Sequence, residues 1–248
     1  MCNGMAGASG MPRVIDHAGR GRLPVGVEDF IQVSEDYAFV DKSLLIKELL
    51  ELGAGRADLF CRPRRFGKSL ALSMLRCFLE APVKGWIEDQ SELFRDLAIS
   101  EYGTQVLSHQ GAHPVVNINF KAASSSSWEK TKNAIAAQVA QECRRHWYLS
   151  DSSQLTPFDK QDLASLAAGD ADNPKLEDSL SLLTRLLTRH HHARCAVLID
   201  EYALPFSSHE ATNFMRTWLA GGLKGNSDLF LGVLTGVQRV SKESIEIE

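Results

Sequence analysis

Along this chain, short apolar runs alternate with longer stretches in which apolar residues recur at helical spacing. Runs of strand length lie at residues 59–62, 115–120, 195–199 and 229–234. The third run is apolar throughout, which is typical of a strand buried on both faces of a parallel sheet. Strands that alternate with long helices, joined by crossovers of fixed hand, leave few topologies. We therefore predict an α/β fold, a three-layer sandwich with a mostly parallel sheet and helices on both faces.

The stretches between these runs carry apolar residues at the i, i+4 spacing of amphipathic helices. Capping signals mark several starts, namely Asp41 and the capping boxes that open at Ser126 and Ser207. Gly221 and Gly222 are expected to end the last helix. The predicted helices cover residues 42–52, 70–79, 91–97 and 159–168, with longer ones after Ser127, from Pro174 to the histidines at 190–192, and after Ser208.

The turn from the first predicted strand into its helix has the pattern of a phosphate-binding loop. Compared with G-x-x-x-x-G-K-[ST], Gly67, Lys68 and Ser69 match, whereas Arg62 replaces the first glycine. Backbone N–H groups and the helix dipole converge at such a turn and suit a polyphosphate. We expect Lys68 to contact the β- and γ-phosphate oxygens and Ser69 to ligate Mg²⁺. The predicted nucleotide-binding residues of the loop are Arg62, Pro63, Arg64, Arg65, Phe66, Gly67, Lys68, Ser69 and Leu70.

The buried run at residues 195–199 ends in two carboxylates, Asp200 and Glu201, which is a Walker B pattern. The carboxyl end of a central parallel strand lies beside the phosphate loop, so Asp200 is expected to hold Mg²⁺ directly or through water. Glu201 is placed to activate an attacking water as a general base. The loop alone is also compatible with a surface turn before a helix. Together with the two carboxylates it indicates nucleotide hydrolysis.

With these two elements, the chain resembles the AAA-ATPase-like family, in which R-P-R-R-F-G-K-[ST] and L-I-D-E-Y-D recur. Residues 62–69 and 198–202 carry those motifs. Further segments resemble the family's L-P-x-G-x-x-D-F, Y-V-D-K-[ST] and L-T-G-x-x-R-[IV]-S-K-x-S-I, at residues 23–30, 39–43 and 234–245. The resemblance thus runs from about residue 23 to residue 245. Within this family, arginine at position 62 is the expected residue.

The resemblance implies a role for the last predicted strand. It places this strand between those that carry the Walker A and Walker B motifs, with Thr235 sensing the γ-phosphate at its tip. Arg239 is a candidate phosphate or intersubunit contact. A turn residue and a surface ion-pairing residue are the alternatives for these two positions. Ala203 departs from the family, which has an aspartate there. Members also tend to continue into a domain similar to PD-(D/E)xK nucleases, so we expect the chain to be C-terminally incomplete.

Composition and charge narrow the classes of partner. The 248 residues carry a net charge of −4 and are 44% hydrophobic, so we expect one sizeable domain without general attraction to nucleic acid or to an anionic membrane. Five cysteines without C-x-x-C spacing indicate core positions in a reducing compartment. Three adjacent histidines at residues 190–192 point in different directions on a helix, which favours a solvated helix end over a metal site.

The N-terminal segment differs from the rest of the chain. Residues 1–22 are rich in glycine and small residues and contain no apolar h-region. We expect a flexible N-terminal arm over residues 1–22 and one AAA-ATPase-like domain over residues 23–248. The arm is poor in acidic residues, so a mitochondrial presequence stays an alternative. No apolar run has the length of a membrane span, and we expect a cytoplasmic protein.

Two functions follow from this sequence. The first is magnesium-dependent ATP hydrolysis, with ATP assigned through the resemblance and Lys68 and Glu201 as the catalytic residues. The second is a nucleotide-binding switch or scaffold with negligible hydrolysis, whose output reaches a protein partner, another copy of the chain or a further effector domain. A phosphotransferase is a third class, but adjacent Asp200 and Glu201 suit water better than a metabolite hydroxyl. No E-x-K follows an apolar run, so the sequence gives no nuclease site.

Overall fold

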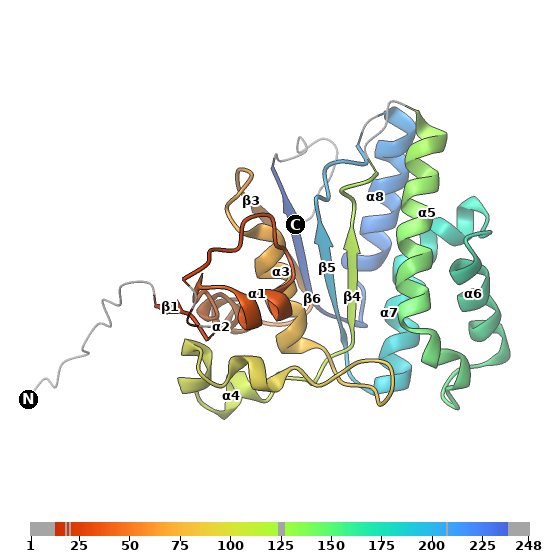
Figure 1. Cartoon of the computed structure of the whole chain (residues 1–248). Coiled ribbons are helices and arrows are strands. Elements are labelled where there is room, and N and C mark those ends of the chain that lie inside the picture. The colour runs from red at the N-terminus through yellow and green to blue at the C-terminus, as the bar shows by residue number, and fades with distance from the viewer. Residues whose placement is uncertain (1–12, 18, 20, 124–126, 207, 238–248) are drawn as a thin grey trace, which may run out of the picture.

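A four-stranded parallel sheet forms the centre of the computed structural model, which describes residues 13–17, 19, 21–123, 127–206 and 208–237. Its strands lie in the order β3-β6-β5-β4, and every neighbouring pair is parallel (Figure 1). The strands are β3 (Arg56–Cys61), β4 (Val115–Asn119), β5 (Cys195–Asp200) and β6 (Leu229–Gly236). The predicted α/β sandwich with a parallel sheet is confirmed.

Helices cover both faces of this sheet. On one side of the sheet lies α3 (Lys68–Leu79), with α1 (Phe30–Asp36) packed on α3 and α2 (Leu44–Glu51) in the same core (Figure 1). On the other side lie α5 (Trp128–Arg145), α7 (Asn173–His191) and α8 (His209–Leu223), and α6 (Pro157–Ala168) packs outside them on α5 and α7. Short elements complete the described part of the chain: β1 (Val14–Ile15), β2 (Phe39–Val40), α4 (Thr104–Leu107) and the 3₁₀ helices η1 (Ser91–Phe94), η2 (Ala98–Glu101) and η3 (Trp147–Asp151).

Strand β5 shows why its run is apolar throughout. Successive side chains of a strand point to opposite faces, and here both faces are covered. Cys195, Val197 and Ile199 belong to the core that includes α5, α7 and α8, whereas Ala196 and Leu198 belong to the core around α3. All five side chains are fully buried. The carboxylate that follows is therefore fixed to a rigid central element.

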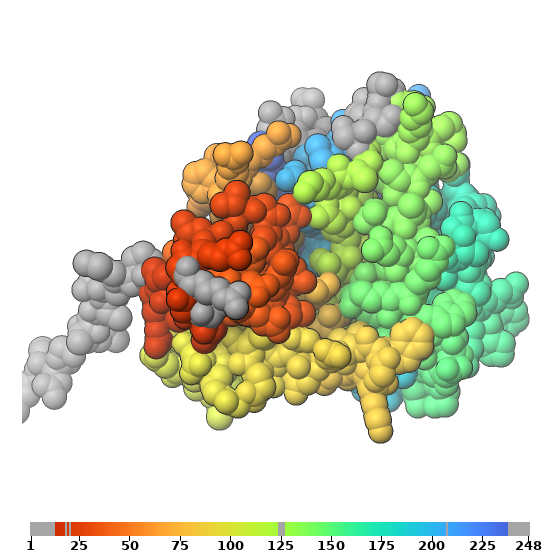
Figure 2. Space-filling model, viewed as in Figure 1, coloured from red at the N-terminus to blue at the C-terminus, as the bar shows by residue number. Residues whose placement is uncertain are grey.

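The segment before α2 lies across the face of the sheet that carries α3 (Figure 2). Val14–Ile15 pairs in antiparallel fashion with Phe39–Val40. The expected flexible arm over residues 1–22 therefore does not hold for these two residues, while residues 1–12, 18 and 20 lie outside the described part. The strand was not predicted because it is only two residues long, lies in a segment rich in glycine and small residues, and pairs with residues 39–40. The assignment of one domain to residues 23–248 stays a prediction.

Two predicted helix ends differ from the structure. Asp41 is not the N-cap of α2, which begins after Ser43; instead the Asp41 carboxylate accepts hydrogen bonds from Ser43 N (2.8 Å) and from Ala98 N (2.7 Å). Helix α8 continues through both glycines to Leu223. Its Gly222 lies against Leu180 of α7, so this glycine allows close helix packing and does not end the helix.

Three cysteines behave as small core hydrophobes, as predicted. Cys77, Cys143 and Cys195 are free and buried, while Cys61 is half-buried. Burial raises the pKa of the Cys77 thiol to about 11 and that of the Cys143 thiol to about 12. Both therefore stay protonated at neutral pH. Cys2 lies outside the described residues.

The histidines at the end of α7 are less solvated than predicted. The His191 ring lies with its Nε2 2.8 Å from the Tyr148 hydroxyl, and the His190 ring lies with its Nδ1 2.8 Å from the Ser152 hydroxyl. Burial lowers the pKa of His191 to about 4, because it disfavours the charged ring. These rings therefore join α7 to η3 in their neutral form.

We predict that close packing at Gly222 is required for stability. A Cβ atom there would lie 2.3 Å from Leu180 Cδ2, so Gly222→Ala should lower the free energy of unfolding by about 1–3 kcal/mol in a urea titration. The matched control is Gly221→Ala in the same helix, where a Cβ atom would lie 4.0 Å from Ser181 Cβ. That variant should be neutral or gain up to about 1 kcal/mol from helix propensity. Equal stabilities of the two variants would contradict this packing.

We also predict a loss of stability in mild acid that depends on His191. Its pKa is about 4 in the folded chain and about 6.5 in an unfolded chain. Between these pH values the unfolded chain binds more protons than the folded chain, so protonation of His191 favours unfolding. The free energy of unfolding is therefore unaffected by this group above about pH 6.5 and decreases as the pH falls toward 4. His191→Gln should weaken the pH dependence of the unfolding free energy in this window, and His192→Asn, at the exposed neighbour, should not. The same pH dependence in all three proteins would refute the assignment.

Candidate nucleotide-binding site

The two predicted phosphate-site motifs meet at the carboxyl edge of the sheet. Strand β6 lies between β3, which leads into the phosphate loop, and β5, which ends in the two carboxylates. This is the strand order that the resemblance implied. Phe60 is in register with Thr235, and Asn119 is in register with Asp200. Strand ends that are far apart in the sequence therefore present polar groups along one edge.

The loop itself bends sharply before α3. Gly67 has a φ of 75° and Arg65 a φ of 68°, both in the left-handed region that favours glycine. Helix α3 begins directly at Lys68. Its first N–H groups therefore face the edge of the sheet, as an anion site requires. Among the other predicted binding residues, those from Arg62 to Phe66 are exposed. Leu70 belongs to the first turn of α3, and its side chain packs against the hydrophobic core on that side of the sheet. Leu70 can therefore offer a ligand its backbone N–H and not its side chain.

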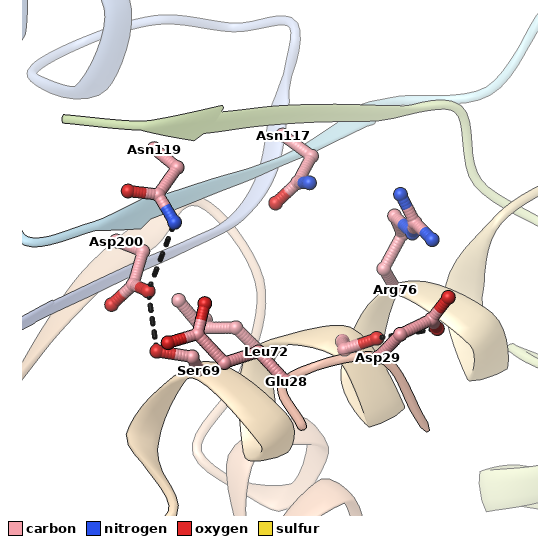
Figure 3. A pocket seen from close by; sticks show the side chains of 9 residues that line it. Glu28, Asp29, Ser69, Leu72, Arg76, Asn117, Asn119 and Asp200 are labelled. Atoms are coloured by element: carbon pink, nitrogen blue, oxygen red, sulfur yellow. Dashed lines mark hydrogen bonds between the residues drawn. The ribbon is translucent and has the colours of Figure 1, made fainter. Parts of the chain in front are cut away.

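Asp200 is the centre of the site. It is 5% exposed, and its carboxylate accepts hydrogen bonds from four elements of the fold. Two donors, Ser69 Oγ on α3 (2.6 Å) and Asn119 Nδ2 on β4 (3.3 Å), are seen in Figure 3. The other two are the backbone N–H of Glu201 (3.0 Å) and the Thr235 hydroxyl on β6. A buried carboxylate is stable when its oxygens receive such donors. These bonds fix the oxygens of Asp200 against the start of α3.

Lys68 and Glu201 form a second, looser pair beside this centre. Their charged atoms, Nζ and Oε1, are 3.9 Å apart, and Lys68 Nζ also lies 3.4 Å from the carbonyl oxygen of Pro63. Glu201 has a φ of 52°, which is uncommon for a residue with a side chain. The next residue holds this turn, because Tyr202 N donates to Thr235 O at 3.0 Å and its ring is buried. The backbone around Glu201 is thus held from both sides.

A polar cavity of about 260 Å³ extends from Ser69 and Asp200 along α3 and β4. Figure 3 shows Asn119, Asp200 and Ser69 at one end and Arg76 and Asp29 at the other. The N-terminal segment covers this cavity, since Phe30 N donates to Ser73 Oγ at 2.9 Å and Glu28 pairs with Lys121 at 3.1 Å. The cavity is lined by Glu28, Asp29, Ser69, Leu72, Ser73, Arg76, Asn117, Asn119 and Asp200.

Sequence reasoning identified some of these residues and missed others. Lys68, Ser69, Asp200, Glu201 and Thr235 come together as the motifs predicted. Asn119, the last residue of β4, also belongs to the site. The structure shows that it contacts Asp200, and its other amide atom, Oδ1, accepts from Lys121 N at 2.8 Å. The signal that could have found Asn119 is that two parallel strands, β4 and β5, end side by side at the same edge of the sheet. Glu28, Asp29, Ser73 and Arg76 were missed, and Arg239 lies outside the described residues.

The sequence profile of a family described as "Predicted AAA-ATPase" matches residues 24–246. The chain belongs to this AAA-ATPase-like family. A relative from Azotobacter chroococcum mcd 1, described as "Uncharacterized protein in vnfD 5'region", is 25% identical over 240 residues. That match covers 91% of this chain but only 39% of the relative, so the chain spans well under half of the relative's length. No solved structure matches the chain significantly.

The donor atoms of this AAA-ATPase-like site fit a hard divalent cation. Ser69 and Asp200 offer hydroxyl and carboxylate oxygens, which are the ligands that Mg²⁺ prefers. Mg²⁺ keeps several waters and needs only one or two protein ligands when a phosphate supplies the rest. The site therefore has the chemistry to hold Mg²⁺ between the chain and a polyphosphate. Among the described residues, no helix combines the length and apolar character needed to cross a bilayer.

We predict that Asp200→Asn destabilises the fold as well as the site. An amide would place an N–H₂ group against donors on at least one side, leaving buried polar atoms unsatisfied at a cost of about 1–3 kcal/mol. The free energy of unfolding in urea, without nucleotide, measures this effect. Asp151→Asn, at an exposed position, is the control and should change little. Wild-type stability of Asp200→Asn would contradict the role of this carboxylate as an acceptor of four hydrogen bonds.

Proposed function

We propose that this chain binds ATP with magnesium at the edge of the sheet and hydrolyses it. One observation carries the proposal. Ser69 of the phosphate loop donates to Asp200 at 2.6 Å across 131 residues of sequence, while Lys68 and Glu201 face one another beside them. A hydroxyl, a carboxylate, a lysine and a glutamate in this arrangement form the working parts of a P-loop ATPase. The nucleoside triphosphate is assigned as ATP through the family.

In this proposal, each charged group has one task. The first N–H groups of α3, together with Lys68, Arg64 and Arg65, stabilise the phosphate charge. Ser69 and Asp200 would hold Mg²⁺, which would neutralise charge on the phosphates when bound. The phosphates compete with Glu201 for Lys68, because both partners are anionic. Release from Lys68 leaves the Glu201 carboxylate able to accept a proton from the attacking water.

Thr235 has a more indirect role in this proposal than the γ-phosphate contact suggested by the resemblance. Its hydroxyl donates to Asp200, and the residue as a whole is 3% exposed. We therefore propose that Thr235 orients the metal-binding carboxylate and reports a change at Asp200 to β6. Contact with a phosphate would require this hydroxyl to leave Asp200.

A nucleotide-binding switch is the second candidate, and the Lys68–Glu201 contact favours it. A glutamate whose carboxylate stays against a lysine is not free to orient an attacking water, so hydrolysis would be slow while binding persists. The matched relative is more than twice as long as the matched segment, which leaves room for an effector region in such proteins. Nucleotide state would then be passed to that region, to a protein partner or to another copy of this chain.

We predict that hydrolysis and binding separate by mutation. Glu201→Gln should lower ATP turnover by about 10²–10⁴-fold, because it removes the general base, and should leave ATP binding within a few-fold. Lys68→Ala should weaken ATP binding itself. Turnover is followed by phosphate release with Mg²⁺, and binding by calorimetry. The matched controls, Glu48→Gln and Lys47→Ala on α2, should behave as the wild type.

Each alternative has a distinct outcome in this experiment. Binding that depends on Lys68, with wild-type turnover no faster than that of Glu201→Gln, would establish the switch and exclude the ATPase. Turnover that survives both substitutions would show that another site or a contaminating enzyme is responsible. Absence of binding in the wild type would overturn both candidate functions.

A further inference from the structure

We infer that Lys42, which lies outside the phosphate loop, is a further cationic residue of the nucleotide site and contacts the polyphosphate. This inference rests on the proposed function and extends it to the segment that precedes α2. The Nζ atom of Lys42 lies 3.9 Å from the position that a Cβ atom on Gly67 would occupy. Gly67 is the residue from which α3 starts, so the ammonium group lies beside the turn that presents its N–H groups to an anion.

The backbone that carries Lys42 is firmly held. On one side of it, the Asp41 carboxylate accepts from Ser43 N and Ala98 N, and Asp41 N donates to Arg13 O at 2.8 Å. On the other side, the fully buried Ser43 hydroxyl accepts from Ile99 N at 3.1 Å. These bonds join the segment to η2. Lys42 therefore projects from a fixed point, which lowers the entropy lost when its side chain binds an anion.

Charge around Lys42 favours an anionic ligand. Two half-buried lysines of the described chain pair with carboxylates, Lys47 with Glu51 at 3.0 Å and Lys175 with Asp162 at 2.9 Å. Within the described residues, Lys42 makes no ion pair, and the same holds for the loop arginines, Arg62, Arg64 and Arg65.

Like charges that gather at the positive end of a helix dipole repel one another until an anion binds between them. Lys68, the lysine of the loop itself, is in contrast already paired with Glu201. Lys42 is thus the lysine that can meet the phosphates without first leaving a carboxylate. Asp41 and Ser43 thus hold the backbone of this segment, and Lys42 between them provides the phosphate contact.

The test compares charge and shape at this position. Calorimetric affinities for ATP, ADP and adenosine are measured with Mg²⁺ for the wild type, Lys42→Gln, Lys42→Arg and the control Lys47→Gln. Loss of one charge-assisted contact should weaken ATP binding of Lys42→Gln by about 10- to 100-fold. Lys42→Arg should recover most of the affinity, adenosine binding should not depend on position 42, and Lys47→Gln should match the wild type.

Failure of this inference is distinct from failure of the proposed function. If Lys68→Ala weakens ATP binding while Lys42→Gln binds ATP as the wild type does, Lys42 is not part of the site and the ATPase proposal stands. If Lys42→Gln weakens adenosine as much as ATP, its effect is structural, and the phosphate contact is refuted. If the wild type binds no ATP, both proposals are overturned.

Discussion

The hydrogen bonds to Asp200 are the constraint on which the rest of the site depends. A carboxylate that is 5% exposed is stable only when donors replace the water it has lost. Here the donors come from α3, β4, β6 and the turn after β5. Because these bonds reach the same two oxygen atoms, they hold the start of α3, the end of β4 and the tip of β6 against the end of β5. The position of the predicted phosphate loop beside the end of β5 is held by these bonds.

The elements around that centre also explain the role of the N-terminal segment. It is anchored by Phe30 N to Ser73 Oγ on α3, and by Asp41 and Ser43 to the backbone of η2. The segment thereby covers the polar cavity, brings Glu28 to its lining and brings Lys42 beside the turn at Gly67. These contacts explain in physical terms how residues 23–30 and 39–43, which resemble family motifs, take part in the same site as residues 62–69 and 198–202.

Much of the architecture could be predicted from local patterns. The run at residues 195–199 predicts a buried strand because it is short and no polar residue interrupts it. Gly67 and Lys68 mark the turn into a helix. The position of β6 between β3 and β5 came from family resemblance, since nothing in its own residues specifies neighbours. Local sequence patterns gave wrong predictions where contacts between distant residues determine the role of a side chain. Gly222 resembles a helix stop but packs on Leu180, and Asp41 resembles an N-cap but bonds to Ala98, 57 residues away. Asp29 and Arg76 belong to the cavity for the same reason, because only the folded chain brings them together.

The central claim is that Ser69 and Asp200 act as one metal-dependent phosphate site. It is tested most directly by a double-mutant cycle of Ser69→Ala and Asp200→Ala, in which ATP affinity is measured with and without Mg²⁺ in proteins shown to be folded. The account predicts that either substitution removes most of the increase in affinity caused by Mg²⁺, and that the double variant is hardly worse than either single one. Additive losses, or an unchanged Mg²⁺ effect in the single variants, would contradict it.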